Sequence, residues 1–387
     1  MKKRIAILGS TGSIGKTLIN IIKQDKKNFD IVLLSADENY KELLNQAKFF
    51  KVKNLIITNE NSYNKTKKDK FSKKINIYNN FNNFRKIFKK KIDYTMSSIS
   101  GIQGLKPTIE IIKFTSKIAI ANKESIICGW DLIQKELKKN KTEFIPVDSE
   151  HFSIWYAIKD INKELIEKIY LTASGGPFLN KSLNKLKNVN SKQAIKHPNW
   201  KMGKKISIDS ATMMNKVFEI IEAKKIFNLS YNKLSILIHP KSYVHAIIKL
   251  KNGLTKIVAH DTNMKIPIFN SLYSSNNFIN SKQLNLKILN NLSFKEINYK
   301  RFSVIKILNK MPENSSLFET ILVSINDKLV ELFLGNKIKF TDIPKKMHNI
   351  LDLNKLKKYK MIKPRKISDI IFLNNKIRSK IEIKNKI

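Results

Sequence analysis

A glycine-rich segment near the start of the chain constrains the fold most. Residues 9–15 read GSTGSIG, directly after the apolar run IAIL at 5–8 and at the start of an amphipathic stretch at 14–23. This is the pattern of a buried strand, a tight turn and a helix, in which backbone N–H groups can approach a pyrophosphate at the positive helix end. The spacing is G-x-x-G-x-x-G rather than G-x-G-x-x-G, so a glycine-rich turn without a ligand is the alternative. We expect a dinucleotide here.

The first 147 residues continue that pattern. Short β-branched runs predict buried strands at 5–8, 31–34, 55–57 and 118–120. Between them, the stretches at 41–50 and 105–114 have the length and periodicity of helices, whereas the Lys/Asn-rich residues 59–93 show no clear pattern. Strands that alternate with helices predict a parallel, doubly wound α/β sheet, so residues 1–147 are expected to form a Rossmann-like domain.

The rest of the chain has a different pattern. Strands are predicted at 169–172, 206–208, 234–238, 244–250 and 255–259. With one helix at 213–227, this predicts a central α+β catalytic domain at 148–275 whose sheet is partly antiparallel. The Asn/Ser-rich residues 274–282 predict a connection, which is given the bounds 276–300. A small helical domain at 301–387 follows, with its clearest helix at 316–334.

The net charge is the most unusual feature of the composition. The 387 residues include 74 Lys+Arg and 31 Asp+Glu, a formal charge of +43 that would ordinarily suggest nucleic acid. The lysines are spread along the whole chain beside an excess of Ile and Asn, as expected of AT-rich coding sequence, rather than clustered with arginine. We therefore expect no specific nucleic-acid partner, and a functional basic surface is the alternative.

The same composition bears on location. Hydrophobic residues make up 42%, enough for ordinary cores, and no window approaches about 18 uninterrupted apolar residues. The run at 5–8 is too short for a signal-peptide core, and the lone Cys128 cannot form an intrachain disulfide. We expect a cytoplasmic protein with no membrane partner, in which Cys128 is buried rather than nucleophilic.

Two acidic residues follow the strand predicted at 144–147. If the chain stays extended there, Asp148 and Glu150 face the same way and can share one divalent cation. The alternative is a helix that begins at Asp148, with both carboxylates placed favourably for the helix dipole. The local sequence favours neither reading.

The helix predicted at 213–227 carries Asn215, Lys216 and Glu219 within one arc of its surface. A solvated face would look the same. The preceding segment 197–203, HPNWKMG, is turn-forming and carries both an imidazole and the large aromatic Trp200, which is typical of a lid.

A strand that ends in small polar residues is a further candidate. Residues 171–178, LTASGGPF, offer a hydroxyl and N–H groups that suit a phosphate, and a plain exit from the strand is the alternative. His239 and His245 do not have a zinc spacing, so we expect both to be structural.

Together these segments resemble the 1-deoxy-D-xylulose 5-phosphate reductoisomerase family. The matching motifs, in family order, are GSTGSIG at 9–15, ANKES at 121–125, PVDSEH at 146–151, SGGPF at 174–178, HPNWKMG at 197–203 and SIDSATMMNK at 207–216. The resemblance implies an enzyme that isomerises the carbon skeleton of 1-deoxy-D-xylulose 5-phosphate and then reduces the product to 2-C-methyl-D-erythritol 4-phosphate with a hydride from NADPH. It further implies Mg²⁺ or Mn²⁺ as the metal, a role in non-mevalonate isoprenoid biosynthesis, and a homodimer. Two alternatives are a nicotinamide-dependent dehydrogenase without isomerase activity and a basic nucleic-acid-binding protein.

The resemblance also implies roles for individual residues. The implied metal ligands are Asp148, Glu150 and Glu219. The implied substrate-binding residues are Lys123, Ser149, Glu150, Ser174, His197, Trp200, Ser210, Asn215, Lys216 and Glu219, of which Lys123 and His197 also count, with the metal ligands, as catalytic. The implied cofactor-binding residues are Ser10, Thr11, Gly12, Ser13, Ile14, Asn39, Asn122, Glu124 and Gly203. Asn326 corresponds to a family asparagine that reaches the active site.

One departure from the family concerns the cofactor. After the second predicted strand the chain reads ADEN at 36–39, where the family commonly has a basic or small neutral residue near position 38. An acidic residue there suits the ribose hydroxyl of NAD and repels the phosphate of NADP. We expect NADPH as the cofactor, with a smaller preference over NADH than is usual for the family.

Overall fold

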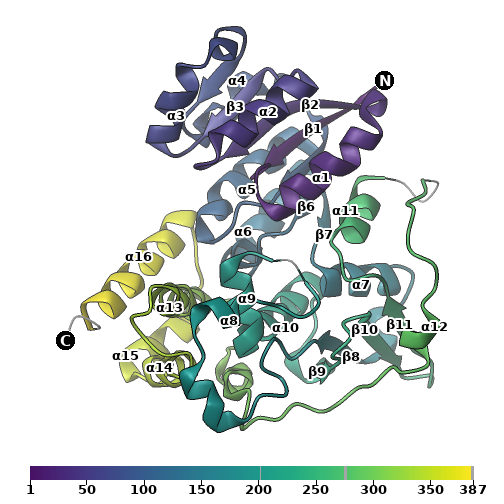
Figure 1. Cartoon of the computed structure of the whole chain (residues 1–387), viewed down its shortest axis with the longest axis vertical. Helices are drawn as coiled ribbons and strands as arrows, with labels where there is room; N and C mark the ends of the chain where they lie inside the picture. Colours follow the sequence, from purple (N-terminus) through teal and green to yellow (C-terminus); the bar gives the residue numbers. More distant parts are fainter. Residues whose placement is uncertain (201, 274–276, 385–387) are drawn as a thin grey trace. The chain divides into compact units, whose positions relative to one another are not determined.

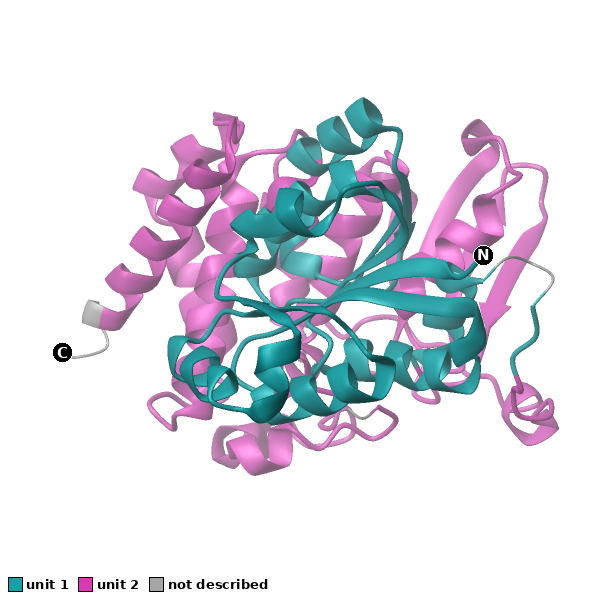
Figure 2. Cartoon of the chain, turned by 90° about the horizontal axis from the view of Figure 1, so that it is seen from above, with its two compact units in different colours: residues 1–125, 131–148, 264–279 teal, residues 126–130, 149–263, 280–387 magenta. Residues whose placement is uncertain are grey.

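The computed structural model describes residues 1–200, 202–273 and 277–384. The chain divides into two compact units, which Figure 2 colours separately. Unit 1 comprises residues 1–125, 131–148 and 264–279, and unit 2 comprises 126–130, 149–263 and 280–387. The expected domain boundaries differ from this division at 126–130 and 264–279, and residues 301–387, expected as a separate domain, are part of unit 2; the expected domains stay a prediction. Residues 274–276, at the start of the expected connection, lie outside the described residues.

Unit 1 is built on a seven-stranded sheet in which every pairing is parallel (Figure 1). Its strands are β1 (Lys3–Leu8), β2 (Phe29–Ala36), β3 (Asn54–Ile57), β4 (Asn76–Tyr78), β5 (Ile92–Ser97), β6 (Thr115–Ile120) and β7 (Glu143–Pro146). The strand order is β4-β3-β2-β1-β5-β6-β7, so the direction of winding reverses between β1 and β5. Ligands of such sheets bind at that switch point, beyond the carboxyl ends of the strands. The predicted doubly wound α/β fold is confirmed.

Unit 1 also contains helices, of which all but α11 lie between or directly after strands of this sheet. They are α1 (Ser13–Gln24), α2 (Tyr40–Phe50), α3 (Glu60–Lys67), α4 (Phe84–Ile87), α5 (Leu105–Ile111), α6 (Lys123–Asn140) and α11 (Lys265–Leu272), with 3₁₀ turns η1 (Lys26–Asn28), η2 (Lys70–Lys74), η3 (Phe81–Asn83), η4 (Ile102–Gly104) and η5 (Ile112–Phe114). Helix α11 packs on α1, and the hydroxyls of Tyr94 and Ser271 lie 2.7 Å apart. The chain therefore returns to unit 1 between the two long segments of unit 2, residues 149–263 and 280–387.

Unit 2 contains a four-stranded sheet of order β11-β10-β8-β9. Its strands are β8 (Ile166–Ala173), β9 (Leu234–Ile238), β10 (Val244–Leu250) and β11 (Thr255–Ala259). Strand β10 is antiparallel to β8 and β11, whereas β8 and β9 are parallel. Helix α7 (Ser149–Ile158) packs on β10 and against α10 (Met214–Phe227), which places the starts of both helices close together.

The remaining elements of unit 2 are mostly helical. They are α8 (Ser191–Ala194), α9 (Lys204–Thr212), α12 (Leu286–Leu289), α13 (Leu317–Leu334), α14 (Asp342–Leu351), α15 (Asn354–Lys357) and α16 (Ile367–Lys384), with η6 (Lys163–Leu165), η7 (Leu183–Asn188), η8 (Tyr231–Lys233), η9 (Ser303–Lys310) and η10 (Lys358–Met361). Ser316 and Glu319 form a capping box that starts α13, which agrees with the predicted helix at 316–334. Among the described residues, no helix combines the length and the apolar character that a membrane span needs.

One predicted strand is wrong. Residues 206–208 lie in the middle of α9, not in a sheet. The alternation of Ile206 and Ile208 with polar residues suggested a strand, but Ser207, Asp209 and Thr212 are themselves buried in unit 2. A helix whose inward face carries buried polar groups does not show apolar periodicity, so tertiary contacts override the local pattern here.

Candidate active site

The glycine-rich loop of unit 1 has the conformation that a pyrophosphate site requires. Gly9 has φ +83°, in the left-handed region. A Cβ added to Gly15 would lie 2.4 Å from the carbonyl oxygen of Gly9, whereas at Gly12 it would meet only that oxygen, at 3.4 Å. Gly12 is the N-cap of α1 and no side chain caps the helix there. The exposed N-terminus of α1 therefore fits a dinucleotide phosphate.

The neighbours of these glycines divide into two groups. Thr11 and Ser13 are accessible at the loop, and Ile14 packs partly against the core. Ser10 is fully buried, and its hydroxyl donates to the carbonyl of Ser35 at 3.3 Å. Ser10 therefore holds the loop against β2 in this structure.

Asn122 forms hydrogen bonds that connect the loop after β5 with the start of α6. Its Oδ1 accepts from the N–H of Ser125 at 2.5 Å and caps α6, while its Nδ2 donates to the carbonyls of Gly101, at 2.8 Å, and Ile99. Those carbonyls belong to the loop that follows β5, and Glu124 is buried in the first turn of α6. Asn122 thus sets the backbone on one side of the switch point.

The residues after β2 bear on cofactor choice. Asp37 accepts a hydrogen bond from the Thr58 hydroxyl at 2.7 Å, Glu38 is exposed, and Asn39 caps α2 by accepting from the N–H of Glu42 at 3.3 Å. Both acidic side chains are exposed, and Asp37 is hydrogen-bonded to Thr58, so Glu38 is the candidate for contact with a ligand at the end of β2.

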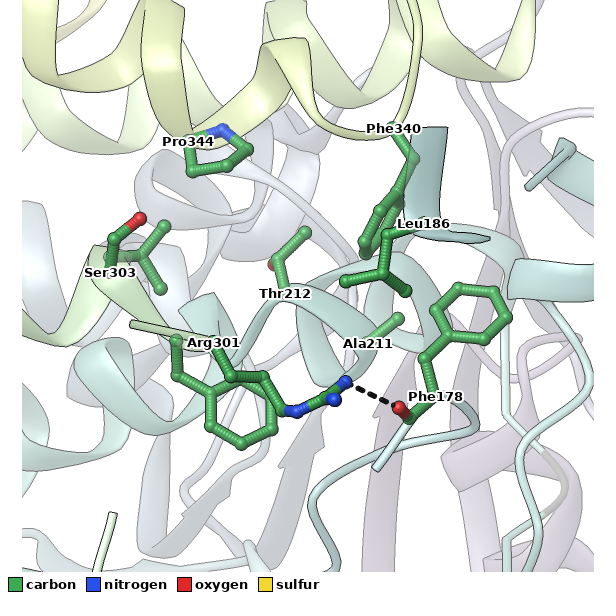
Figure 3. A pocket seen from close by; sticks show the side chains of 10 residues that line it. Phe178, Leu186, Ala211, Thr212, Arg301, Ser303, Phe340 and Pro344 are labelled. Atoms are coloured by element: carbon green, nitrogen blue, oxygen red, sulfur yellow. Dashed lines mark hydrogen bonds between the residues drawn. The ribbon is translucent and has the colours of Figure 1, made fainter. Parts of the chain in front are cut away.

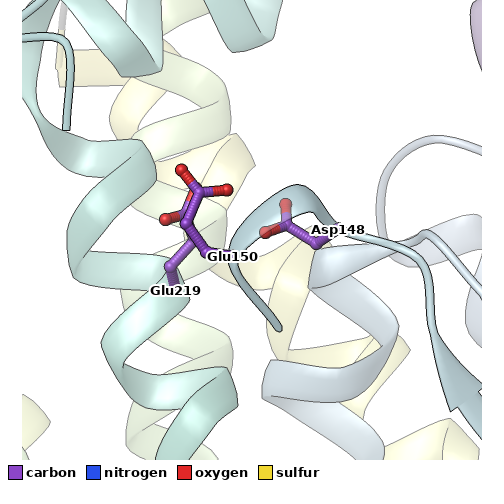
Figure 4. A group of neighbouring side chains, drawn as sticks. All are labelled: Asp148, Glu150 and Glu219. Atoms are coloured by element: carbon purple, nitrogen blue, oxygen red, sulfur yellow. The ribbon is translucent and has the colours of Figure 1, made fainter. Parts of the chain in front are cut away.

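Three carboxylates come together at the starts of α7 and α10. Asp148, Glu150 and Glu219 each offer an oxygen, and the three oxygens lie within 4.8 Å of one another (Figure 4). Asp148 directly precedes α7, so the chain there is the start of a helix rather than an extended strand. The geometric reason given for the metal hypothesis was wrong, yet the carboxylates cluster. A set of carboxylate oxygens suits a hard divalent cation such as Mg²⁺.

Two basic side chains pair with this cluster. Lys216 is 4% exposed, and its Nζ lies 2.8 Å from Oε1 of Glu150 and also contacts Glu219. Burial by itself disfavours its charge, but both carboxylates outweigh that effect and raise the pKa of Lys216 above its ordinary value. In unit 1, Lys123 pairs with Asp148 in the same way. Each carboxylate thus has a lysine partner.

Other polar groups complete the arrangement. The amide of Asn215 donates to Glu219, and the hydroxyl of Ser149 donates to Oε2 of Glu150 at 2.5 Å. The predicted face of α10 is therefore not solvated, since Lys216 and Glu219 are buried. It presents donors and acceptors to the start of α7.

His197 and Ser174 form the second part of the site. Nδ1 of His197 accepts from the N–H groups of Asn199 and Trp200, both at 3.1 Å, so the ring proton is on Nε2. Nε2 then donates to Oγ of Ser174 at 3.0 Å, and the N–H of Gly176 donates to the same oxygen at 3.0 Å. With both acceptor positions used, Ser174 offers its hydroxyl proton to a ligand. Burial lowers the pKa of His197 from 6.5 to about 4, so the ring is neutral.

The loop that carries Ser174 packs directly on α9. A Cβ at Gly176 would lie 2.8 Å from the carbonyl oxygen of Ser210. Ser210 itself is half-buried in the last turn of α9, and Met213 follows at φ +68° before α10 begins. This turn brings Ser174, Ser210 and the start of α10 into one region of unit 2.

The predicted lid segment rests on two stacked histidines. The Trp200 ring contacts the His245 ring edge-on, with centroids 6.0 Å apart, and His245 stacks on His260 at 3.8 Å. His239 is also buried, with Nδ1 3.0 Å from the carbonyl oxygen of Ser293. Lys201 lies outside the described residues, and Gly203 is the exposed N-cap of α9.

Several residues that shape the site were not predicted. Asn199 donates to the carbonyl of Pro240 at 2.6 Å and so anchors the lid segment. Its place in the turn-forming motif at 197–203 could have indicated this structural role. Asn326, by contrast, was expected at the active site, and its Nδ2 donates to the buried carboxylate of Asp209, the neighbour of Ser210, at 2.8 Å. His260 and Arg301 carried no local signal.

A doubly wound sheet with an open glycine-rich turn and a cluster of carboxylates paired with buried lysines define a class: an enzyme that uses a dinucleotide and a divalent cation. Family models match most of the chain, with 1-deoxy-D-xylulose 5-phosphate reductoisomerase at residues 5–129 and C-terminal domains of the same enzyme at 144–227 and 261–380. The chain belongs to the 1-deoxy-D-xylulose 5-phosphate reductoisomerase family. This confirms the resemblance found in the motifs.

Individual relatives of the chain belong to the same family. The reductoisomerase of Pelagibacter ubique is 60% identical over 98% of both chains, and that of Clostridium kluyveri is 39% identical over 88% of this chain and 90% of its own. Among solved structures, a reductoisomerase in complex with NADPH, fosmidomycin and magnesium has a TM-score of 0.90 at 31% identity, covering 99% of this chain and 98% of that one. The Zymomonas mobilis enzyme in complex with NADPH has a TM-score of 0.87 at 28% identity, covering 100% and 99%.

Proposed function

We propose that this chain converts 1-deoxy-D-xylulose 5-phosphate to 2-C-methyl-D-erythritol 4-phosphate, by metal-assisted isomerisation of the carbon skeleton and reduction of the resulting aldehyde by NADPH. The observation that carries the proposal is the convergence of Asp148, Glu150 and Glu219 within 4.8 Å. A dehydrogenase that only transfers hydride does not need three carboxylates at one point.

The carboxylates are the proposed metal ligands. A divalent cation held by them would act as a Lewis acid that stabilises negative charge on adjacent substrate oxygens. The two lysines offset part of the charge of the three carboxylates, and Lys123 is the proposed cation beside the substrate. Because Lys216 pairs with Glu150 and Glu219 in this structure, it has to change partner when metal and substrate bind.

The phosphate of the substrate is proposed to bind at Ser174, Ser210, Asn215 and Lys216. His197 supports this assignment because it fixes the Ser174 hydroxyl as a donor. Phosphate oxygens accept such hydrogen bonds, and a lysine adds charge. The Trp200 segment is proposed to close over the substrate and exclude water from the aldehyde.

The dinucleotide is proposed to bind at the glycine-rich loop and at the residues expected from the family. NADPH would supply the hydride. Solved relatives in complex with NADPH and with magnesium support both cofactors. We further propose that Mn²⁺ can replace Mg²⁺, that the protein is a cytoplasmic homodimer, and that it serves isoprenoid precursor biosynthesis.

The test is the oxidation of NADPH with 1-deoxy-D-xylulose 5-phosphate, with and without added Mg²⁺. The proposal expects oxidation that depends on both the sugar phosphate and the metal, with the methylerythritol phosphate as product. If the enzyme reduces simple aldehydes with NADPH but does not isomerise the sugar phosphate, the dehydrogenase alternative is correct.

A further inference from the structure

Arg301 holds the loop that carries Ser174 from a distant part of the sequence. Its Nη1 donates to the carbonyl of Phe178 at 2.8 Å, and its Nη2 donates to the carbonyl of Lys181 at 2.5 Å (Figure 3 shows the first of these). These two carbonyls lie at the ends of a turn that the N–H of Lys181 closes on the carbonyl of Phe178 at 3.0 Å. One planar guanidinium therefore spans the whole turn.

The backbone from which the Arg301 side chain extends is fixed by a local turn. The N–H of Arg301 donates to both the carbonyl and the side-chain oxygen of Asn298, each at 3.1 Å, so a local turn fixes its backbone. Arginine has a rigid fork of donors, whereas a lysine ammonium is a point charge on a flexible stem. Only arginine can hold both carbonyls in one fixed geometry.

The clamped loop determines the distance between two proposed phosphate ligands. Ser174 lies at its start, and Gly175 and Gly176 follow at φ +82° and +69°, where the backbone turns sharply. Gly176 packs against Ser210, so no side chain fits between the loop and α9. A shift at the Phe178 end of the loop would therefore move the Ser174 hydroxyl relative to Ser210.

The loop also borders a small cavity. Phe178 contacts Phe340 edge-on at 5.2 Å, yet a cavity of about 30 Å³ lies between the loop, Ala211, Arg301 and Phe340 (Figure 3). That volume is enough for a water molecule. On this side the loop borders a cavity, and the two hydrogen bonds of Arg301 fix the loop at Phe178 and Lys181.

We propose that Arg301 is a positioning residue for the phosphate end of the substrate site, acting through the loop at 174–181. This rests on the proposed function, because it assumes that Ser174 and Ser210 bind the phosphate. Arg301 acts through its fork of hydrogen bonds rather than through its charge.

The experiment compares Arg301→Lys and Arg301→Gln with the control Lys300→Gln, which removes the neighbouring exposed positive charge. Steady-state kinetics give KM for the sugar phosphate and for NADPH, together with kcat. We expect both Arg301 variants to raise KM for the sugar phosphate by about tenfold with a smaller change in kcat, and KM for NADPH to stay constant. Lys300→Gln should resemble the wild type. An Arg301→Lys variant with the wild-type KM would overturn the proposal, because the charge alone would then suffice.

A second measurement does not depend on turnover. Hydrogen exchange of the amides in 175–181 should be faster in Arg301→Lys, and the affinity for inorganic phosphate, followed by its protection against thermal unfolding, should fall about tenfold. Faster exchange with unchanged phosphate affinity would mean a merely structural clamp and overturn the proposal. If the wild type binds phosphate but shows no reaction with the sugar phosphate, the proposed function fails while the role of Arg301 in phosphate binding is still tested.

Discussion

The Nζ atom of Lys216 lies 2.8 Å from Oε1 of Glu150, which joins helix α10 to the start of helix α7. The same ammonium contacts Glu219, one turn further along α10. A buried lysine thus lies between two of the carboxylates that are the proposed metal ligands. Removing one partner of such a group leaves the other charges buried and unbalanced, so single substitutions there should have large effects.

The first prediction concerns Glu219. In Glu219→Gln the site loses one of three carboxylates, so we expect turnover to fall by orders of magnitude and the metal concentration for half-maximal activity to rise. NADPH affinity should be nearly unchanged. The control is Glu167→Gln, which removes an exposed carboxylate of the same unit. Near wild-type turnover of Glu219→Gln at low Mg²⁺ would contradict the metal assignment.

The lid segment gives the second prediction. Trp200→Ala should raise KM for the sugar phosphate and lower kcat, because it removes the aromatic that is proposed to exclude water. The tryptophan fluorescence of the wild type should change when a phosphonate hydroxamate binds. Trp155→Phe, which removes a tryptophan of helix α7 instead, should keep that change. Unchanged kinetics in Trp200→Ala would mean that residues 197–203 only connect two elements.

Stability should depend on pH through His197. Its pKa is about 4 in the folded protein and near 6.5 when unfolded, because burial disfavours its charge. Between those values only the unfolded chain takes up the proton, so the free energy of unfolding falls as pH drops from 6.5 toward 4; above pH 6.5 there is no effect. The free energy of unfolding is measured by urea denaturation of the wild type and of His197→Gln over pH 4–8. A difference between the two proteins that is constant with pH would show that His197 is not held neutral.

The last prediction concerns cofactor choice. Glu38 is exposed after β2, where a negative charge would repel the phosphate of NADPH. Glu38→Lys should improve kcat/KM for NADPH about fivefold, roughly 1 kcal/mol for a partly exposed charge contact, and leave NADH nearly unchanged. Glu38→Gln should give a smaller gain. An equal effect on both cofactors would show that Glu38 faces away from that phosphate.

Local chemistry explains which parts of the protein were predictable. The glycine-rich loop was predictable because the positive φ of Gly9 and the close contact at Gly15 are requirements of neighbouring backbone atoms. Most of the parallel strands were predictable because strands buried on both faces need continuous apolar runs, such as Ile5 to Leu8, all fully buried. Strands β4 and β5 were not predicted, because they lie in or beside the Lys/Asn-rich stretch at 59–93. Cys128 is buried, as its apolar neighbours indicated.

The site depended on the fold. The local sequence paired Asp148 with Glu150, and Glu219 was added only through the family resemblance. What brings Glu219 to them is the packing of α7 against α10, since carboxylates this distant in sequence meet only through tertiary structure. Helix α9 also depended on tertiary structure. Its buried Asp209 accepts a hydrogen bond from Asn326 of α13, so a polar residue occupies the inward face of the helix. That face shows no apolar periodicity, and a strand was predicted at 206–208 instead. Arg301 is the clearest case, because its partners lie more than a hundred residues away and are backbone carbonyls, which every residue has. Sequence by itself determined the glycine-rich turn, most of the parallel strands and the residue types available for chemistry. Tertiary structure decided which charges are buried together, because burial is a property of the whole packed unit and not of any local segment.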